Sequence, residues 1–330
     1  MNDKKLTIVM YHYVRDLKNS RFPGIKGLDT TLFKEQVEYM QKHYHFVSVE
    51  QVICAHNNGT ALPEHAILLT FDDAYTDHFT NVFPILKKKG IQGAFFPPVK
   101  AVTKHTVLDV NKIHFILAST KEENLPKLLN EIKILLDRYR DEYTLLPFDD
   151  YLNKLAVADH LDCKEVTFVK RLLQVNLDER LRKIITDILF QKTVDMDEAA
   201  FSRELYMSID QIKCMVNSGM HIGSHGYDHY WLGSLPKDKQ EFEIKESVKF
   251  IDEIGGDVNN WTICYPYGNY NEDTISLLKK YNCQLGFTTN VDVASIDRQV
   301  ADKRFKLSRI DTNDLPKERN AATNIWFDKG

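Results

Sequence analysis

The sequence alternates short, apolar, β-rich runs with segments of helical periodicity, and this alternation limits the folds open to the chain. Residues 66–71 form a nearly continuous apolar run, as expected of a strand that is buried on both faces. A helix is predicted from about residue 76 to residue 89, where Gly90 ends it, and another strand over residues 92–96. Strands that alternate with helices in this way predict a parallel α/β architecture.

The alternation extends over most of the chain. The β-rich runs lie at residues 6–10, 66–71, 92–96, 221–224, 262–265, 284–288 and 305–310. Helical spacing is clear over residues 31–43, and Ser208 and Gln211 form a capping box before a helix that Gly219 ends. We therefore predict about seven strands, most of them parallel.

One region interrupts this pattern. Between residues 104 and 203 strand signals are few, and apolar residues recur at helical spacing. The sequence therefore predicts an α/β domain of residues 1–103 and 204–315. Residues 104–203 would be a helical insertion between the third and fourth strands, and residues 316–330 a C-terminal tail.

Composition excludes several classes of protein. A chain of 330 residues, 43% of them hydrophobic, can bury a large core without disulfides or a structural metal. A net charge of −4 provides no basic field for nucleic acid, so no nucleic-acid partner is expected. No membrane span is expected either, because no run approaches roughly 18 apolar residues. The oligomeric state is left open.

The cysteines and the first residues predict a cytoplasmic protein. The 5 cysteines are odd in number and share no C-x-x-C spacing, which favours reduced thiols. The residues before Tyr11 lack the apolar run of about 7–15 residues and the cleavage site of a signal peptide. A secreted protein with its leader removed is the alternative.

Two adjacent carboxylates, Asp72 and Asp73, directly follow the buried strand of residues 66–71. Sites in parallel α/β folds are built at the carboxyl ends of strands, and adjacent carboxylates there need a compensating positive charge. A helix N-cap is the simpler interpretation, since Asp is a favoured cap. The pair, with Tyr75 and His78 close behind, favours a metal or acid–base site.

Two histidines, His225 and His229, follow the predicted strand of residues 221–224. Histidines at this spacing can bind one metal ion, and with a carboxylate they form the ligand set of a hydrolytic site with open positions. His221 is a rival ligand. The turn of residues 265–268, Tyr-Pro-Tyr-Gly, needs no function to exist, but beside a metal its N–H groups could bind an oxyanion.

These motifs, taken together and in this order, resemble the polysaccharide deacetylases of carbohydrate esterase family 4, which contain the NodB homology domain. They are Thr-Phe-Asp-Asp at residues 70–73, His-x-x-x-His at 225–229 and Tyr-Pro-Tyr-Gly at 265–268. The resemblance covers about residues 1–100 and 205–315, and the helical insertion has no counterpart in the core family. It implies that residues 1–103 and 204–315 form a distorted (β/α)7 barrel with one divalent metal ion, usually zinc.

The resemblance also implies roles for the residues at the motif positions. Asp73, His225 and His229 would be the metal ligands, and Asp72 would be the catalytic base. Tyr267 would offer its main-chain N–H to the oxyanion.

The sequence departs from the family pattern at three places. Gly226 follows the first motif histidine, where Ser or Thr is usual, and residues 263–265 contain no arginine before the Pro-Tyr pair. The late Leu-x-x-His motif, which supplies the general acid, appears as Leu-Ser-Arg-Ile-Asp at residues 307–311.

A first-strand histidine offers a replacement for the missing general acid. The residues Tyr-His-Tyr-Val at 11–14 resemble the Tyr-His-x-Val sequence of the branch similar to poly-N-acetylglucosamine deacetylases. This resemblance implies that His12 is the general acid, with Arg309 or Asp311 orienting the catalytic groups. A histidine satisfied by local hydrogen bonds is the alternative interpretation of His12.

The expected function is metal-dependent hydrolysis of an N-acyl group, acetyl or formyl, from an amino sugar in surface-glycan biosynthesis. The expected substrate is nucleotide-linked, lipid-linked or an oligosaccharide. Two other hypotheses stay open. The missing motif arginine and late histidine would suit a sugar-binding relative with impaired catalysis. A metal-dependent phosphoesterase would also use aspartates and histidines, but it needs further ligands and a basic clamp.

Overall fold

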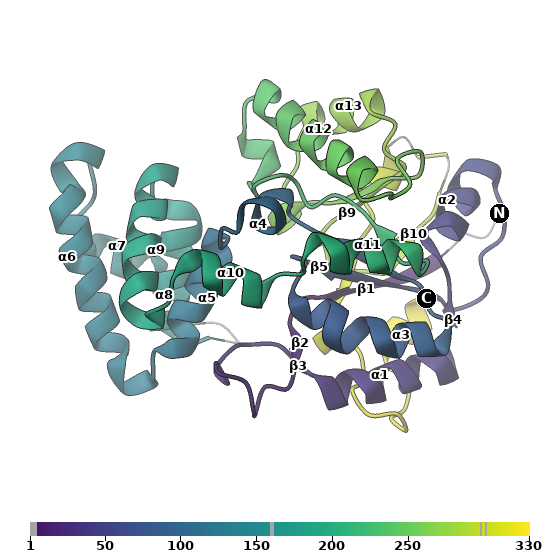
Figure 1. The fold of residues 1–330 in the computed structure, drawn as a ribbon, viewed down its shortest axis with the longest axis horizontal. Helices are drawn as coiled ribbons and strands as arrows, with labels where there is room; N and C mark the ends of the chain where they lie inside the picture. Colours follow the sequence, from purple (N-terminus) through teal and green to yellow (C-terminus); the bar gives the residue numbers. More distant parts are fainter. Residues whose placement is uncertain (1–4, 159–161, 298, 301) are drawn as a thin grey trace. The chain divides into compact units, whose positions relative to one another are not determined.

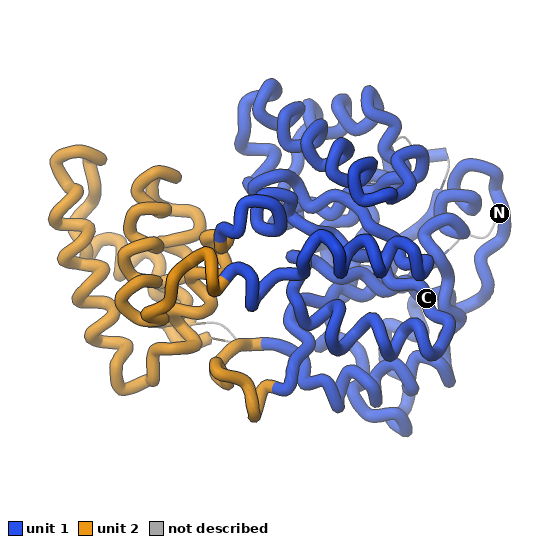
Figure 2. Tube along the Cα trace, in the orientation of Figure 1, with its two compact units in different colours: residues 1–16, 27–106, 202–330 blue, residues 17–26, 107–201 orange. Residues whose placement is uncertain are grey.

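The computed structural model describes residues 5–158, 162–297, 299–300 and 302–330 and has a mixed α/β fold (Figure 1). The chain divides into two compact units, which Figure 2 distinguishes by colour. The first comprises Met1–Asp16, Gly27–Thr106 and Ser202–Gly330, and the second Leu17–Lys26 and Val107–Phe201. All the candidate site residues of the sequence analysis belong to the first unit.

The first unit is built around a mostly parallel sheet. β1 (Lys5–Tyr11), β5 (Ala66–Asp72), β6 (Gly93–Phe96) and β7 (His221–Ile222) are successive parallel neighbours. Short strands pair at the sides, namely β4 (His45–Phe46) with β5, β11 (Ile310–Asp311) with β1, and β10 (Ala294–Ser295) antiparallel to β1. Every residue of β5 is buried, which confirms the prediction of a strand covered on both faces.

Two further strand pairs belong to this unit. They are β2 (Val14–Arg15) with β3 (Leu28–Asp29), and β8 (Thr262–Cys264) with β9 (Leu285–Phe287), both parallel. Single bridges join Ser224 to Ile263 and Phe287 to Leu307. The pairing therefore runs from β1 through β5, β6, β7, β8 and β9 to the segment that leads into β11, which pairs with β1.

The last predicted strand, over residues 305–310, is wrong for most of its length. Lys303–Phe305 form a 3₁₀ turn, and the regular strand is confined to Ile310–Asp311. Leu307 contributes only its single bridge to Phe287.

Helices connect these strands along the chain. They are α1 (Thr30–His43), α2 (Val49–Asn58), α3 (Phe83–Lys89), α4 (Val99–Lys104), α11 (Ile209–Asn217), α12 (Lys237–Glu253), α13 (Glu272–Lys280) and α14 (Ile325–Lys329). The predicted capping box is present at α11, where the Ser208 side chain accepts from the N–H of Gln211 and the Gln211 side chain accepts from the N–H of Ser208.

The helix predicted from residue 76 to residue 89 is divided. A π-helical turn, η1 (His78–Val82), precedes α3, and Gly90 ends α3 in the left-handed region, as expected. Pro84 lies at the start of α3 and has no N–H to donate to residue 80, so a regular α-helical turn cannot form there.

The regular secondary structure of the second unit is entirely helical in its described residues. Its helices are α5 (Asp109–Ser119), α6 (Leu125–Tyr143), α7 (Phe148–Leu155), α8 (Lys164–Arg171), the π-turn η3 (Leu172–Asn176), α9 (Glu179–Val194) and the first half of α10 (Glu198–Leu205). Inside it, the buried Lys112 pairs with Asp187 and, at 2.9 Å, with Glu198. The unit also includes residues 17–26, which the sequence analysis placed in the α/β domain.

The C-terminal tail packs against the first unit's main hydrophobic core. Trp326 and Phe327 of α14 contact that core, and the Phe327 ring stacks on His65 with centroids 3.8 Å apart. Among the described helices, none combines the length and the apolar character needed to cross a bilayer.

Candidate metal and catalytic site

The two adjacent aspartates lie at the carboxyl end of β5. Asp72 is the last residue of the strand, and Asp73 follows with a φ of 72°, in the left-handed region. The Asp73 N–H donates to the Phe96 carbonyl at 3.1 Å, which ties this turn to β6. The turn directs the two carboxylates to different partners, Asp73 to histidines and Asp72 to an arginine.

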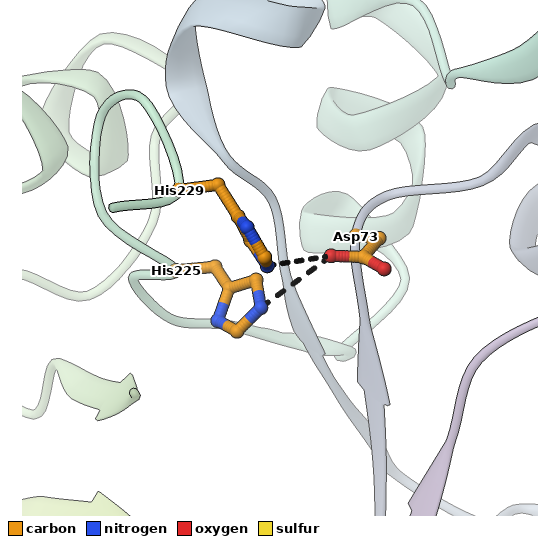
Figure 3. Close-up of side chains that lie close together, drawn as sticks. All are labelled: Asp73, His225 and His229. Atoms are coloured by element: carbon orange, nitrogen blue, oxygen red, sulfur yellow. Dashed lines mark ion pairs between the residues drawn. The ribbon is translucent and has the colours of Figure 1, made fainter. Parts of the chain in front are cut away.

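The two motif histidines come from the loop after β7. Asp73 Oδ1 lies 3.4 Å from Nε2 of His225 and 3.4 Å from Nε2 of His229 (Figure 3). One ligand atom from each of the three residues lies within 4.8 Å of the others. His225 Nδ1 donates to the Cys264 carbonyl at 2.7 Å, and Nε2 is the ring nitrogen that faces Asp73. Burial opposes protonation of this ring, but the neighbouring Cys264 and Asp73 raise the pKa of His225 well above its usual value, so binding of a metal ion at Nε2 would release a proton.

These three residues fit a divalent metal ion. Asp73 Oδ1 is buried and has no hydrogen-bond partner, whereas Asp73 Oδ2 accepts a hydrogen bond from Tyr75 Oη at 2.7 Å. Burial lowers the pKa of His229 to about 3, against the opposing charge of Asp73, so this imidazole is neutral, as a ligand must be. Two imidazole nitrogens and one carboxylate leave open positions for water and substrate.

Asp72 is held by Arg309 from the segment before β11. The guanidinium makes two hydrogen bonds to the carboxylate, Nη1–Oδ1 at 3.0 Å and Nη2–Oδ2 at 2.8 Å, and both side chains are buried. Arg309 also donates to the Thr288 carbonyl at 2.9 Å and to Thr70 Oγ1 at 3.1 Å. Burial alone would raise the pKa of Asp72, but Arg309 and His225 outweigh it and lower that pKa to about 2.

Cys264 occupies the stretch where the family has its arginine. Its Sγ donates to Asp72 Oδ2 at 3.2 Å, while its carbonyl accepts the His225 bond. A guanidinium nevertheless reaches Asp72, because Arg309 supplies it from a segment 237 residues away in sequence. The missing arginine of the motif therefore does not leave this carboxylate without a cation.

His12 lies at the end of β1, the strand beside β5. Its Nε2 is 4.0 Å from Asp72 Oδ2, and its side chain is 41% exposed. Its carbonyl accepts a hydrogen bond from His78 Nε2 at 2.8 Å. The imidazole is therefore close to the aspartate pair and accessible to a substrate.

Tyr267 lies beside the histidine pair. Its backbone is left-handed, with a φ of 56°, and its ring contacts the edge of His229 at 4.8 Å between centroids. The Tyr267 ring also stacks on Trp231, with centroids 4.3 Å apart and an interplanar angle of 5°.

Two other candidates have different surroundings from those expected. The Asp311 side chain caps a 3₁₀ turn and accepts from the Asn313 N–H at 2.8 Å and from Asn313 Nδ2 at 2.7 Å. Of the two candidates Arg309 and Asp311, it is Arg309 that contacts Asp72. His221 contacts Thr262 Oγ1 at 2.9 Å and lies 4.0 Å from Glu50, outside the ligand cluster.

Sequence reasoning missed three groups that contact the site. Tyr75 was noticed only as a neighbour of the aspartates, and Cys264 only as a departure from a motif. Glu243 of α12, a buried carboxylate that accepts hydrogen bonds from the histidine loop, was not considered. No local sequence pattern distinguishes Glu243 from the other glutamates of α12, because its contact with the histidine loop depends on how the helix packs.

Comparison with known proteins relates this geometry to a family. The chain matches the profile of the polysaccharide deacetylases over residues 59–133 and 146–286. It is 38% identical over 81 residues to the poly-β-1,6-N-acetyl-D-glucosamine N-deacetylase of Escherichia coli (strain K12), covering 24% of this chain and 12% of that protein. It is 32% identical over 106 residues to YxkH of Bacillus subtilis (strain 168), a protein that carries the name polysaccharide deacetylase. This alignment covers 32% of this chain and 38% of YxkH.

Solved structures share the fold. The deacetylase PplD of Streptococcus pyogenes, in complex with acetate, has a TM-score of 0.57 at 20% identity and covers 96% of this chain and 94% of its own. IcaB of Ammonifex degensii has a TM-score of 0.54 at 19% identity, and the alignment covers 94% of this chain and 91% of the IcaB chain. The profile match and these alignments extend into the helical region, so the expectation that this region has no counterpart in the family is wrong.

Proposed function

The chain belongs to the polysaccharide deacetylase family, and from this premise we propose that it is a metal-dependent hydrolase that removes an N-acyl group, acetyl or formyl, from an amino sugar. One observation carries the proposal. The Asp73–His225–His229 cluster, with its unpartnered buried carboxylate oxygen, lies beside a buried carboxylate that an arginine keeps ionised. Such a pairing of ligand set and base suits hydrolysis.

The three ligands would hold one divalent ion, for which we propose zinc. When bound, such an ion would polarise an acyl oxygen and lower the pKa of a bound water towards roughly 7. Asp72 would accept the proton of the attacking water, and Arg309 fixes the orientation of this carboxylate and its ionised state.

Two further residues would act on the acyl group. The main-chain N–H of Tyr267 would stabilise the negative charge that develops on the acyl oxygen, a role supported by the contact of the Tyr267 ring with the ligand His229 and by the left-handed turn at this residue. His12 would donate a proton to the departing nitrogen. Its position 4.0 Å from Asp72 supports this role, since a general acid and a general base must reach the same small group.

The substrate would be an amino sugar that is nucleotide-linked, lipid-linked or part of an oligosaccharide. The likeness to an E. coli enzyme named for poly-β-1,6-N-acetyl-D-glucosamine supports an N-acetylated glucosamine unit and a part in surface-glycan biosynthesis. The matched segments span only 12% and 38% of the two relatives' lengths, so their activities are carried over as a proposal. A cytoplasmic location also stays a proposal, supported by five free cysteines.

The same proposal extends to the fold. The circuit of strand pairing through β1, β5, β6, β7, β8, β9 and the segment before β11 would be the distorted (β/α)7 barrel of the family. Residues 107–201 of the second unit would be a helical insertion between β6 and β7.

Acetate and amine release tests the proposal directly. The purified protein is stripped of metal, reloaded with Zn²⁺ and incubated with β-1,6-linked N-acetylglucosamine oligosaccharides and with a nucleotide-linked N-acetylglucosamine. We expect equal amounts of acetate and free amine, only after reloading. His225→Ala protein should neither retain the ion nor release acetate. Stoichiometric Zn²⁺ with no release from N-acetyl or N-formyl sugars would instead indicate a sugar-binding relative, and release of phosphate from sugar phosphates a phosphoesterase.

A further inference from the structure

The backbone of the loop between His225 and His229 is hydrogen-bonded to a buried carboxylate on α12. Glu243 of α12 is 2% exposed, and its Oε2 accepts hydrogen bonds from the N–H groups of Tyr227 at 2.7 Å and Asp228 at 2.9 Å. These two residues are the middle of the His225–His229 segment. A single oxygen therefore binds the backbone between the two ligands.

The opposite groups of the same backbone are bound by α4. The carbonyl of Gly226 accepts from the Val99 N–H at 3.2 Å, and the carbonyl of Tyr227 accepts from the Lys100 N–H at 2.8 Å. The Lys100 ammonium also pairs with the Asp228 carboxylate. The donors of the loop are thus held by α12 and its acceptors by α4, so its path depends on both helices.

The local backbone leaves room for the carboxylate. Gly226 has a φ of 74°, and a Cβ there would lie 3.0 Å from Glu243 Oε2, tighter than an ordinary contact. The N–H of Gly226 is bound separately, by Ser224 Oγ at 3.1 Å. A side chain at residue 226 would therefore crowd Glu243, and glycine at this position leaves room for its carboxylate.

We propose that Glu243 is a positioning residue that holds His225 and His229 at metal-binding separation before the ion arrives. Burial raises the pKa of Glu243 to about 7, so its carboxyl group accepts these hydrogen bonds while only partly ionised. The two partly buried N–H groups would carry a desolvation cost if they lost this acceptor. Without Glu243 the loop would change its conformation so that the two N–H groups find other acceptors. The Nε2 atoms of His225 and His229 would then no longer both face Asp73 Oδ1. This inference rests on the proposed metal site.

Metal affinity measured on the full chain tests the inference. Zn²⁺ is titrated into metal-free parent, Glu243→Ala, Glu243→Gln and Glu246→Ala proteins against a competing chelator. We expect about a 10- to 100-fold weaker affinity for Glu243→Ala, as for the loss of groups that orient ligands elsewhere. Glu243→Gln keeps an acceptor oxygen without the charge and should lose about threefold to tenfold. Glu246 lies on the same helix outside the loop contact, so Glu246→Ala should match the parent.

Two additional readouts separate positioning from general support of the fold. The absorption spectrum of the Co²⁺-loaded protein reports ligand geometry, and we expect it to change in Glu243→Ala and to return towards that of the parent in Glu243→Gln. Thermal unfolding of the metal-free proteins reports the fold. If Glu243→Ala does not fold, the Zn²⁺ affinity of Glu243→Gln relative to the parent decides whether Glu243 positions the ligands.

The outcomes distinguish this inference from the proposed function. Parent-like Zn²⁺ affinity in the folded Glu243 variants would overturn the positioning role and leave the deacetylase proposal intact. A parent protein that binds no divalent ion would overturn both.

Discussion

Asp72 and Asp73 are neighbours in the sequence, yet their carboxylates have separate partners. The left-handed turn at Asp73 points its carboxylate at His225 and His229, whereas Asp72 keeps the strand direction and meets Arg309. Two like charges this close are tolerated because each has its own counter-group. The left-handed turn at Asp73 thus gives the two neighbouring carboxylates different surroundings.

Removing Arg309 should change the pH dependence of activity. In Arg309→Leu protein burial of Asp72 persists without the guanidinium, so the pKa of Asp72 rises from about 2. A general base works only when deprotonated, so activity is lost as pH falls through that pKa. The acid limb of kcat/KM should therefore move to higher pH. Breaking this buried pair should also lower the free energy of unfolding by about 3–5 kcal/mol.

Arg309→Lys provides the control for that experiment. A lysine keeps the positive charge but loses the two parallel hydrogen bonds. Its acid limb should lie between those of the parent and Arg309→Leu. Identical pH profiles for all three proteins would show that Arg309 does not set the ionisation of the base.

Replacing His12 should slow turnover without releasing the metal. His12 is outside the ligand cluster, so His12→Ala and His12→Gln should bind the same amount of Zn²⁺ as the parent. Loss of a general acid should lower kcat by about 10²–10⁴. Steady-state acetate release and elemental analysis measure the two effects. Full activity in the glutamine variant, which resembles histidine in size but cannot titrate, would assign the proton to another group.

At the scale of elements, the turn after β5 contains backbone conformations that L-residues adopt reluctantly. Ala74 follows Asp73 with a φ of 56°, and both are buried. Left-handed backbone costs an L-residue roughly 1–2 kcal/mol, which glycine avoids. The carbonyl of Ala74 accepts from the Met207 N–H at 2.8 Å, a contact that helps to hold the turn in this conformation.

Ala74→Gly should consequently be nearly neutral for stability. Relief of the left-handed strain offsets the lost methyl group, about 0.8 kcal/mol, and the greater backbone freedom of glycine in the unfolded chain, about 0.5–1 kcal/mol. Ala55→Gly, at a buried position within α2, loses a methyl group with no strain to relieve, and should cost about 1.5–2 kcal/mol. Urea unfolding of both variants measures the difference. Equal losses would mean that Ala74 is not strained.

The π-turn η1 links the motif of residues 70–73 to the strand end that carries His12. His78 donates to the His12 carbonyl, Asn81 Nδ2 donates to the Val14 carbonyl at 2.8 Å, and Arg15 pairs with Asp77 at 2.7 Å. Turns of this type often occur at functional sites. Here the turn directly precedes α3, whose first turn contains Pro84.

At the scale of the whole molecule, the last residues of the chain contribute to its core. Phe327 stacks on His65 and meets Tyr44 edge-on, with ring centroids 5.4 Å apart. The C-terminal segment therefore packs against residues from the first fifth of the chain. A contact over such a separation in sequence adds to stability only once the whole unit has folded.

Phe327→Ala should lower the free energy of unfolding by about 1–2 kcal/mol, because a partly buried aromatic side chain is removed from the core. Ile325 on the same short helix is 63% exposed, so Ile325→Ala serves as the matched control and should change stability by less than about 0.5 kcal/mol. Denaturant unfolding gives both values. A neutral Phe327→Ala would show that the tail does not support the core in solution.

The sequence alone was sufficient for features that depend on nearby residues. The buried strand before Asp72, the capping box at Ser208 and the end of α3 at Gly90 follow from periodicity and local turn chemistry, and the structure has all three. The motifs were also sufficient for the family, which the profile match confirms. Motifs at strand ends are informative because parallel strands place their carboxyl ends at one edge.

Tertiary structure alone decided which distant groups meet the site. The sequence left open whether Arg309 or Asp311 orients the catalytic groups, and only the folded structure shows that Arg309 contacts Asp72 whereas Asp311 caps a 3₁₀ turn. Glu243 and Cys264 contact the site through helices and strands whose packing no local pattern encodes. Local rules act over a few residues of chain, whereas these contacts join segments up to 237 residues apart, so the folded arrangement of the whole unit determines them.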